Sequence, residues 1–353
     1  RTPENARAFI DQMATHLRAP SDEAIARLLA RARLDTPSIE KLPEWSTWRA
    51  VTQLQQENLN LDPEELRRYF SYQNTRDGLL DLTQELFGVR IRPWVTNVWA
   101  PDVDAFEMLE GERVIGHFYI DPFPRDGKHK IPRIARIRTG AKAGPIPEAV
   151  LILNTERGRI DYSDVVTFFH EFGHLLHVLF SGQSELAMQV SRDMEYDAIE
   201  APSQVLEAWA RDYETLRRFA RNETGQPIPQ SLVERLNAGR SLYAPFGDMY
   251  YLADAAVALD YHSRDLTNVD LTAAYFNTLR RYLDLDRIRD SHPQAAFMHL
   301  AATGCAYYNY IWSKALAVDL LTRFQKEGLH NPATAAAYRE MILAPGGSES
   351  MNV

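Results

Sequence analysis

One apolar helical segment constrains the fold of this chain more than any other feature. Residues 163–180 read SDVVTFFHEFGHLLHVLF, with apolar side chains on nearly every face of the helix that their spacing predicts. We expect such a helix to be buried, with other elements packed around it. The segment also contains histidines and a glutamate, whose burial is costly unless each has a partner. The sequence therefore predicts a central helix that holds a ligand inside the fold.

The spacing of these polar residues indicates a metal ion as the ligand. His170 and His174 lie one helical turn apart on the same face, where both can bind one ion. Glu171 is next to this face and can reach a water on the metal. In this H-E-x-x-H arrangement the glutamate is the general base of zinc-assisted peptide hydrolysis. His177 falls off the face, so we expect it to pack or to support a ligand; core histidines held by hydrogen bonds remain the alternative reading of His170 and His174.

A catalytic zinc site usually takes a third protein ligand, and the nearest donors lie in the segment RDMEYDAIEAPSQVLEAWA. Glu200 is the best candidate, because apolar residues flank it and a proline two positions later marks the start of the next helix. Glu195 and Asp197 stand in a more polar context, and we expect them to be supporting or solvated groups. Glu207 lies two turns further on and either orients a ligand histidine or is an exposed helical glutamate.

Composition limits the classes of protein that remain. Cys305 is the single cysteine, which rules out an intramolecular disulfide and a cysteine-rich zinc knuckle, so any metal is held by His, Asp or Glu. The net charge of -9 argues against a nucleic-acid partner. The sequence has neither an apolar run long enough to cross a bilayer nor a secretory leader. We therefore expect a cytoplasmic protein without a membrane anchor.

The pattern along the chain predicts a mainly α protein with a small β-sheet. Residues 1–90 have helical periodicity, with starts at Pro3, at Ser21 and at Pro63, and the last helix of this segment closes at Gly88. Residues 91–160 carry short runs of Val, Ile, Phe and Tyr, with a probable hairpin at Glu110-Gly111. Residues 161–353 are helical again and contain the zinc-binding core. No linker or repeat separates these parts, so we expect a single catalytic unit over 1–353.

The motifs resemble a known family. FFHEFGHLLH followed by EYDAIEAPSQVLEAW is similar to the zinc helix and the next helix of the thimet oligopeptidase and oligopeptidase A family of zinc metallopeptidases. The segments LDPEELRRYF, WAPDVDAFEM, GHFYIDPFPRDGK and REMILAPGGSES extend the resemblance, in the family's order, over essentially the whole chain. The resemblance implies a zincin-like fold of the thimet-oligopeptidase type, with the family's N-terminal helical wall absent from this sequence. It also implies one Zn²⁺ per chain, held by His170, His174 and Glu200, and Glu171 as the base.

A third family hallmark lies in HLAATGCAYYNYIWSKALA. In the family, a histidine, a Gly-Tyr loop and a Tyr-Tyr-x-Tyr helix donate hydrogen bonds to the substrate and to the developing oxyanion. By position His299, Tyr307 and Tyr310 match, and the resemblance implies catalytic roles for them. Cys305 stands where the family has the loop tyrosine, and the loop is shorter here. From the residues alone, helix packing is the more frequent role of such tyrosines.

Together these features predict a zinc metalloendopeptidase, an oligopeptidase that hydrolyses internal bonds of short peptides. We expect the segment AVLILN, residues 149–154, to form the sheet edge on which a peptide lies as an added strand. Two alternatives stay open: a non-hydrolytic zinc-containing peptide-binding protein, and a zinc carboxypeptidase or dipeptidase. The oligomeric state is not predicted.

Overall fold

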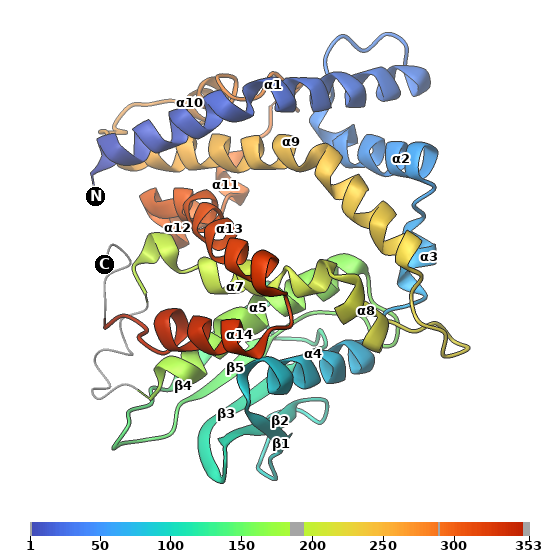
Figure 1. Ribbon diagram of the computed structural model, residues 1–353. Helices are drawn as coiled ribbons and strands as arrows, with labels where there is room; N and C mark the ends of the chain where they lie inside the picture. The colour runs from blue at the N-terminus through green and yellow to red at the C-terminus, as the bar shows by residue number, and fades with distance from the viewer. Residues whose placement is uncertain (1, 184–193, 289, 349–353) are drawn as a thin grey trace. The chain divides into compact units, whose positions relative to one another are not determined.

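A computed structural model describes residues 2–183, 194–288 and 290–348 of the chain (Figure 1). The chain divides into two compact units. The first joins Arg1–Asp62 to Glu234–Trp312, and the second joins Pro63–Val233 to Ser313–Val353. The expectation that 1–353 works as a single catalytic unit stays a prediction. In the described part of the chain, no helix combines the length and the apolar character that crossing a membrane requires.

The first unit is helical, and two long helices, α1 and α9, form its core. They run alongside each other, and small or apolar side chains of both are buried between them (Figure 1). The elements that contribute to this unit are α1 (Pro3–Asp35), η1 (Glu44–Ser46), α2 (Thr47–Leu59), α9 (Gln230–His262), α10 (Leu271–Leu279), α11 (Pro293–Ala296), α12 (His299–Ala302), η4 (Gly304–Tyr308) and the first turn of α13 (Asn309–Glu327).

The first helix is longer than the sequence predicts. A second start was expected at Ser21, but α1 continues through Pro20, and Ser21 is fully buried. An interior proline removes one backbone hydrogen bond and costs about 3 kcal/mol. The apolar stripe of α1 continues on both sides of the proline, with Ile10 and Leu28 each completely buried in the same core. The packing of this stripe outweighs the cost of the proline. The residues around Pro20 alone do not show this, because the packing involves other parts of the chain.

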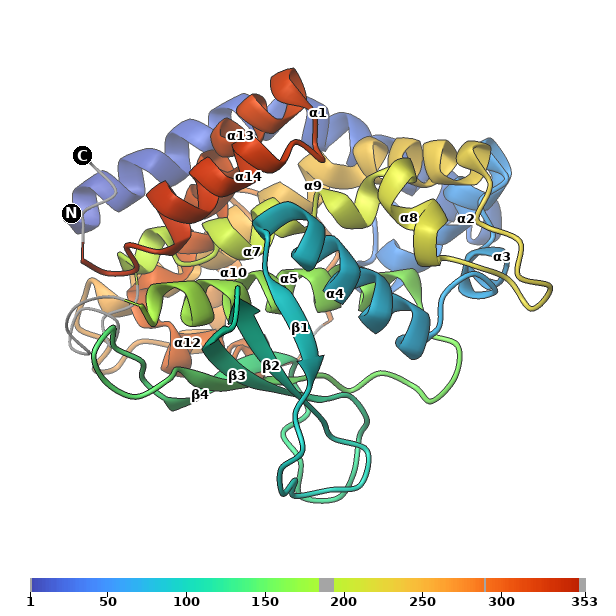
Figure 2. The ribbon, with the colours of Figure 1, turned by 60° about the horizontal axis from the view of Figure 1, so that its bottom comes forward.

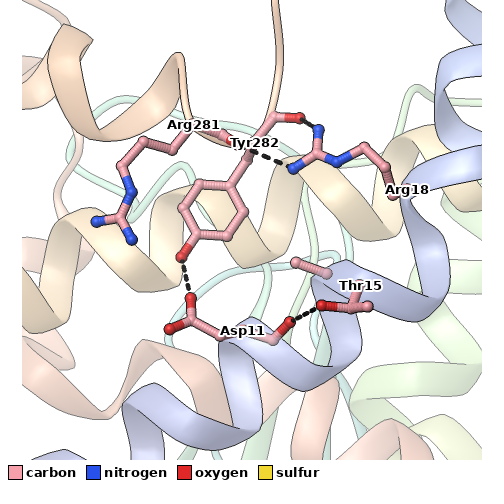
Figure 3. Close-up of a pocket in the computed structure, with 6 residues that line it drawn as sticks. Asp11, Thr15, Arg18, Arg281 and Tyr282 are labelled. Carbon is pink, nitrogen blue, oxygen red and sulfur yellow. Dashed lines mark hydrogen bonds between the residues drawn. The ribbon is translucent and has the colours of Figure 1, made fainter.

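Polar contacts fasten α1 to the turn that follows α10, around a shallow pocket shown in Figure 3. The hydroxyl of Tyr282 donates to a carboxylate oxygen of Asp11 at 2.9 Å. Arg18 donates to the carbonyl oxygens of Arg281, at 2.8 Å, and of Tyr282. These bonds fix the position of α1 in the unit. Both terminal nitrogens of the Arg18 guanidinium are hydrogen-bonded to backbone carbonyl oxygens.

The second unit contains a five-stranded sheet with helices packed on it, as predicted (Figure 2). The strands are in the order β1-β2-β3-β5-β4, and all neighbours are antiparallel except β3 and β5. The predicted hairpin is confirmed: Glu110 pairs with Arg113, and Gly111 has the positive φ that the tight turn requires. The strands are β1 (Arg90–Pro93), β2 (Asp104–Glu110), β3 (Arg113–Asp121), β4 (Arg133–Arg138) and β5 (Glu148–Ile152). The helices are α3 (Pro63–Arg67), α4 (Tyr72–Phe87), α5 (Tyr162–Ser181), η2 (Tyr196–Ala198), α7 (Ala201–Leu206), η3 (Trp209–Arg211), α8 (Tyr213–Phe219), the rest of α13, α14 (Pro332–Tyr338) and η5 (Arg339–Leu343).

Helix α5 is the buried helix that the sequence predicts, and it lies along one face of the sheet (Figure 2). Its first turn is capped where the backbone N–H of Asp161 donates to the carboxylate of Asp164 at 3.4 Å. Gly116 of β3 allows the close approach of the helix, since a Cβ there would lie 2.8 Å from a methyl carbon of Leu179. The sheet therefore supports α5 directly, without a gap.

The expected peptide-binding edge is not where the sequence placed it. The first four residues of the run AVLILN belong to β5, which lies between β3 and β4, so it is not an edge strand. Ala149 and Leu151 are completely buried on the side of α5, while Val150 packs into a small cluster on the opposite face. An unbroken apolar run is typical of a strand covered on both faces. The edge next to β5 is β4, whose sequence RIARIR carries the charges that are common on exposed edges.

Gly173 sets the distance between α5 and the next helix, α7. A Cβ at this position would lie 2.6 Å from the Cα of Ser203 and 2.7 Å from the carbonyl oxygen of Pro202, and backbone atoms cannot yield as a flexible side chain would. Only glycine permits this approach. Because α7 follows directly on Glu200, this approach also sets how near that residue comes to α5.

We predict that Gly173→Ala lowers the free energy of unfolding by about 1 to 3 kcal/mol, because it overpacks the α5–α7 contact. The matched control is Gly247→Ala in α9, where an added Cβ meets nothing within 4 Å and where alanine favours the helix. Denaturant unfolding of both variants checks this. Equal stability of the two would show that the close contact at Gly173 is not required.

Candidate metal centre

Three side chains, two from α5 and one from the residue before α7, meet in the second unit. His170 and His174 project from neighbouring turns of α5, with ring centroids 5.1 Å apart. Glu200 is the residue directly before α7. The Nε2 atoms of both histidines lie 3.1 Å from the same carboxylate oxygen, Oε2 of Glu200. The structure thus brings together the three residues that the sequence proposes as ligands, with donor atoms within 4.8 Å of one another.

Hydrogen bonds with two serines, Ser203 and Ser313, restrain Glu200. It is only 8% exposed, and the hydroxyl of Ser203 lies within hydrogen-bond distance of two oxygens of Glu200, the backbone carbonyl oxygen at 2.8 Å and Oε2 at 3.2 Å. The backbone N–H of Glu200 donates to the hydroxyl of Ser313 at 3.3 Å, and that hydroxyl donates to the carbonyl oxygen of Asp197 at 2.7 Å. These bonds fix the direction of the carboxylate before any ligand arrives. A rigid donor loses little conformational entropy on binding.

Glu207 supports His170 from the other side of its ring. Nδ1 of His170 lies 2.9 Å from Oε1 of Glu207, whose second oxygen accepts a hydrogen bond from Arg211. With the proton on Nδ1, the lone pair of Nε2 points to Glu200, which is the tautomer that a metal ligand needs. Glu207 is therefore not an exposed helical glutamate: it contacts His170, and its role in orienting a metal ligand stays a prediction.

The electrostatics of the centre favour a positive charge between the two imidazoles. Burial alone would lower the pKa of His170, but hydrogen bonds to Glu200 and Glu207 raise that pKa to about 10. Burial would likewise raise the pKa of Glu200, yet His174 and His170 hold it well below its usual range. Two nitrogens and one oxygen directed at one point are a donor set that suits Zn²⁺. The residues present therefore fit this metal.

Glu171 lies next to this group without being part of it. Its side chain is largely buried, and burial raises the pKa of its carboxyl, an effect that His174 and His170 partly oppose. A carboxylate whose pKa is raised toward neutrality is better suited to accept and return a proton. The structure places Glu171 beside the two histidines, as the spacing of the motif predicts.

The remaining polar residues of this region take other positions. His177 is buried and lies outside the group of three, in agreement with its predicted supporting or packing role. Asp197 is 4% exposed, so it is not a solvated group, and Glu195 is partly exposed; neither belongs to the group.

His299, Tyr307 and Tyr310 also come together, but in the first unit. The ring centroid of His299 lies 5.0 Å from that of Tyr307 and 5.8 Å from that of Tyr310, and the two tyrosine rings are 5.1 Å apart. Burial raises the pKa of Tyr307 far above its usual range, so this phenol stays protonated. The three rings form one aromatic cluster at the junction of α12, η4 and α13.

Sequence reasoning missed several supporting residues. Arg211 follows Glu207 by four positions, so the helical pairing rule could have found it. Tyr251 extends the aromatic cluster, with its ring 6.2 Å from Tyr307, but it lies far away in the sequence and carries no local signal. Ser203 and Ser313 likewise show their role only in three dimensions.

Comparison with known proteins agrees with this architecture. The model of peptidase family M3 matches residues 1–353. Oligopeptidase A of Escherichia coli (strain K12) is 28% identical over 367 residues, covering 98% of this chain and 53% of that protein. Mitochondrial intermediate peptidase of Rattus norvegicus is 26% identical over 364 residues, covering 99% of this chain and 51% of that protein. The solved structure of Pz peptidase A with inhibitor 2 superposes with a TM-score of 0.61 at 14% identity, over 100% of this chain and 54% of that chain, which shows a shared fold.

The chain therefore belongs to peptidase family M3. The resemblance to the thimet oligopeptidase and oligopeptidase A family is confirmed, and so is the mainly helical, zincin-like fold with its small sheet. The chain spans about half the length of the curated relatives that it matches.

We predict that Glu207→Ala lowers the affinity for Zn²⁺ about 10- to 100-fold, because His170 loses the partner that fixes its tautomer. The control is Glu214→Ala, which removes a glutamate that also pairs with an arginine, Arg217, but on the surface, where its side chain is 54% exposed. Competition with a chromophoric chelator measures both affinities. An unchanged affinity in the Glu207 variant would show that this carboxylate does not orient the ligand.

Proposed function

We propose that this chain is the zinc-binding part of a metalloendopeptidase that cleaves internal bonds of short peptides. The observation that carries the proposal is the meeting of His170 Nε2 and His174 Nε2 at one oxygen of Glu200, with Glu171 alongside. Membership of peptidase family M3, and relatives that are called oligopeptidase A, support it. The proposal assigns one Zn²⁺ to each chain.

The proposed ligands are His170, His174 and Glu200. A bound Zn²⁺ would act as a Lewis acid on the scissile carbonyl group and would lower the pKa of a water ligand. The chain supplies the rest of the chemistry. Glu207 keeps His170 in the tautomer that presents Nε2, and Ser203 holds the Glu200 carboxylate in place.

Glu171 is the proposed proton carrier. It takes a proton from the attacking water and later passes it to the nitrogen of the leaving amine. Both transfers benefit from a carboxyl whose pKa is raised, because the acid and base forms are then closer in free energy near neutral pH. Burial supplies that shift in this chain.

The aromatic cluster is the proposed donor to the developing negative charge. Tyr310, with His299 and Tyr307, carries the roles that the resemblance implies, and a protonated phenol can donate where the oxyanion forms. Tyr307 remains a neutral phenol because it is buried.

The edge strand β4 is the proposed binding surface for the peptide backbone. It lies next to β5, and its outer side has no neighbouring strand among those of the described sheet. An added strand binds through its main chain, which tolerates many side-chain sequences. Short peptides of varied sequence are therefore the proposed substrates, and the cytoplasm stays the proposed compartment.

We predict that Glu171→Gln keeps about one zinc per chain and loses at least about 10³-fold in kcat, because the variant has no base. Metal analysis and cleavage of a short peptide blocked at both ends measure this, with Glu214→Gln as the control. Equal cleavage by the wild type and the Glu171 variant would refute the base assignment. A zinc-loaded wild type that cleaves nothing would favour a peptide-binding protein, and one that cuts only unblocked peptides would favour an exopeptidase.

We also predict that Tyr310→Phe lowers kcat about 10²- to 10³-fold with little change in KM, because a donor to the transition state is lost. The matched control is Tyr308→Phe, two residues earlier on the same stretch, whose ring packs 6.3 Å from that of Trp312. Steady-state kinetics on one peptide compare them. The same kcat in both variants would remove Tyr310 from the mechanism.

A further inference from the structure

A second pocket in the first unit is lined by a distinctive combination of side chains. It encloses about 410 Å³ and lies among η1, α2 and the middle of α9. Its aromatic lining consists of Trp48, Phe246, Tyr250, Tyr251 and Tyr307. Its acidic lining consists of Glu44 and Asp254, and the lining includes no lysine, arginine or histidine. Ring faces and carboxylates both attract cations.

One of the two carboxylates is already neutralised. Glu44 accepts a hydrogen bond from Tyr250 at 2.6 Å and pairs with the guanidinium of Arg287, whose side chain is 9% exposed. Arg287 is not among the residues that line the pocket, and the central carbon of its guanidinium lies 5.7 Å from the centre of the Tyr250 ring. Arg287 therefore balances Glu44 and does not occupy the pocket.

Asp254 has no cation in direct contact. It accepts a hydrogen bond from the hydroxyl of Tyr275 at 3.4 Å, and in the described part of the chain no lysine or arginine nitrogen is within ion-pair distance of it. Burial raises the pKa of the Asp254 carboxyl to about 7, although the charge of Arg287 partly opposes this effect, so ionising the carboxyl without a cation in contact is costly. A cation that enters the pocket removes this cost by supplying the missing partner.

We propose that this pocket binds the guanidinium or ammonium group of a basic side chain, with Asp254 as the ion-pair partner and the aromatic rings as the walls. The position of Tyr307 argues for a side chain of a peptide. Tyr307 lines the pocket and also belongs to the aromatic cluster, and Tyr251 stacks on it at an interplanar angle of 16°. A peptide held at the cluster can therefore extend a basic side chain into the pocket. This assignment of the substrate rests on the function proposed above.

The pocket itself can be tested without zinc and without hydrolysis. The probe is N-acetyl-argininamide, with N-acetyl-citrullinamide as its neutral isostere, titrated by calorimetry. We expect the arginine probe to bind measurably and the citrulline probe to bind at least about tenfold more weakly, because it lacks the charge. Asp254→Asn should abolish this preference while keeping an acceptor for Tyr275. Equal binding of the two probes, or an unchanged preference in the variant, would overturn the proposal.

A second variant guards against misfolding. Trp48 is 70% exposed, so Trp48→Leu leaves the core intact, and we expect it to weaken the arginine probe severalfold through loss of a cation–π partner. Thermal unfolding of both variants is the control. For Asp254→Asn we expect a melting temperature no lower than that of the wild type, since the variant buries no ionisable group. Unchanged affinity in both folded variants would locate the binding elsewhere.

A peptide experiment identifies the source of the cation. Zinc-loaded Glu171→Gln protein is titrated with short peptides in which one arginine, or one citrulline, moves along the sequence. We expect the arginine peptide to bind about tenfold tighter than its citrulline partner, and about tenfold tighter than the small probe, when the arginine is at one position of the peptide. This gain should require Asp254. Such a result would assign the pocket to side chains of the substrate. If only the small probe discriminates, the pocket takes free cations and the peptide assignment is wrong. Failure of the proposed hydrolysis would leave the small-probe result unaffected.

Discussion

The sharing of one carboxylate oxygen by two imidazole nitrogens is the interaction on which the second unit depends. Nε2 of His170 and of His174 both lie 3.1 Å from Oε2 of Glu200, whose side chain is buried while the two rings are half-buried. Such a group is costly to bury unless a positive charge completes it. The network continues beyond these three residues: Glu207 contacts His170, and Arg211 donates to Glu207, so that each charged group lies beside one of opposite charge. The need to assemble this network explains why the most polar positions of α5 share one face of an otherwise apolar helix.

The packing around α5 follows from that requirement. Gly116 lets the sheet approach one side of the helix, and Gly173 lets α7 approach the other. Both glycines serve to remove a side chain at a point of contact, so their role is steric. The result is that Glu200 reaches α5 from a rigid helix start, and Ser203 and Ser313 fix its direction. Precise placement of ligands by packing of regular elements is what a preorganised site requires.

Much of this could be predicted from the sequence, because the signals are local. The buried helix, the pair His170 and His174, and the hairpin at Gly111 each follow from spacing or turn chemistry within a few residues. Other features depend on tertiary contacts. Residues 149–152 belong to an inner strand, β5, because β4 pairs on its outer side, and α1 continues through Pro20 because its apolar stripe packs on α9. The pocket at Asp254 is lined by segments that are far apart in the sequence, so no local sequence pattern predicts it.

The most direct test of the metal centre is an anomalous-difference map from crystals of the zinc-loaded Glu171→Gln variant, measured on both sides of the zinc absorption edge. Our account predicts one strong peak per chain, about 2.0 to 2.2 Å from Nε2 of His170, Nε2 of His174 and a carboxylate oxygen of Glu200. The same map should show Glu207 still hydrogen-bonded to Nδ1 of His170. A peak bound by other residues, or no peak at these three in crystals that contain zinc, would contradict the account.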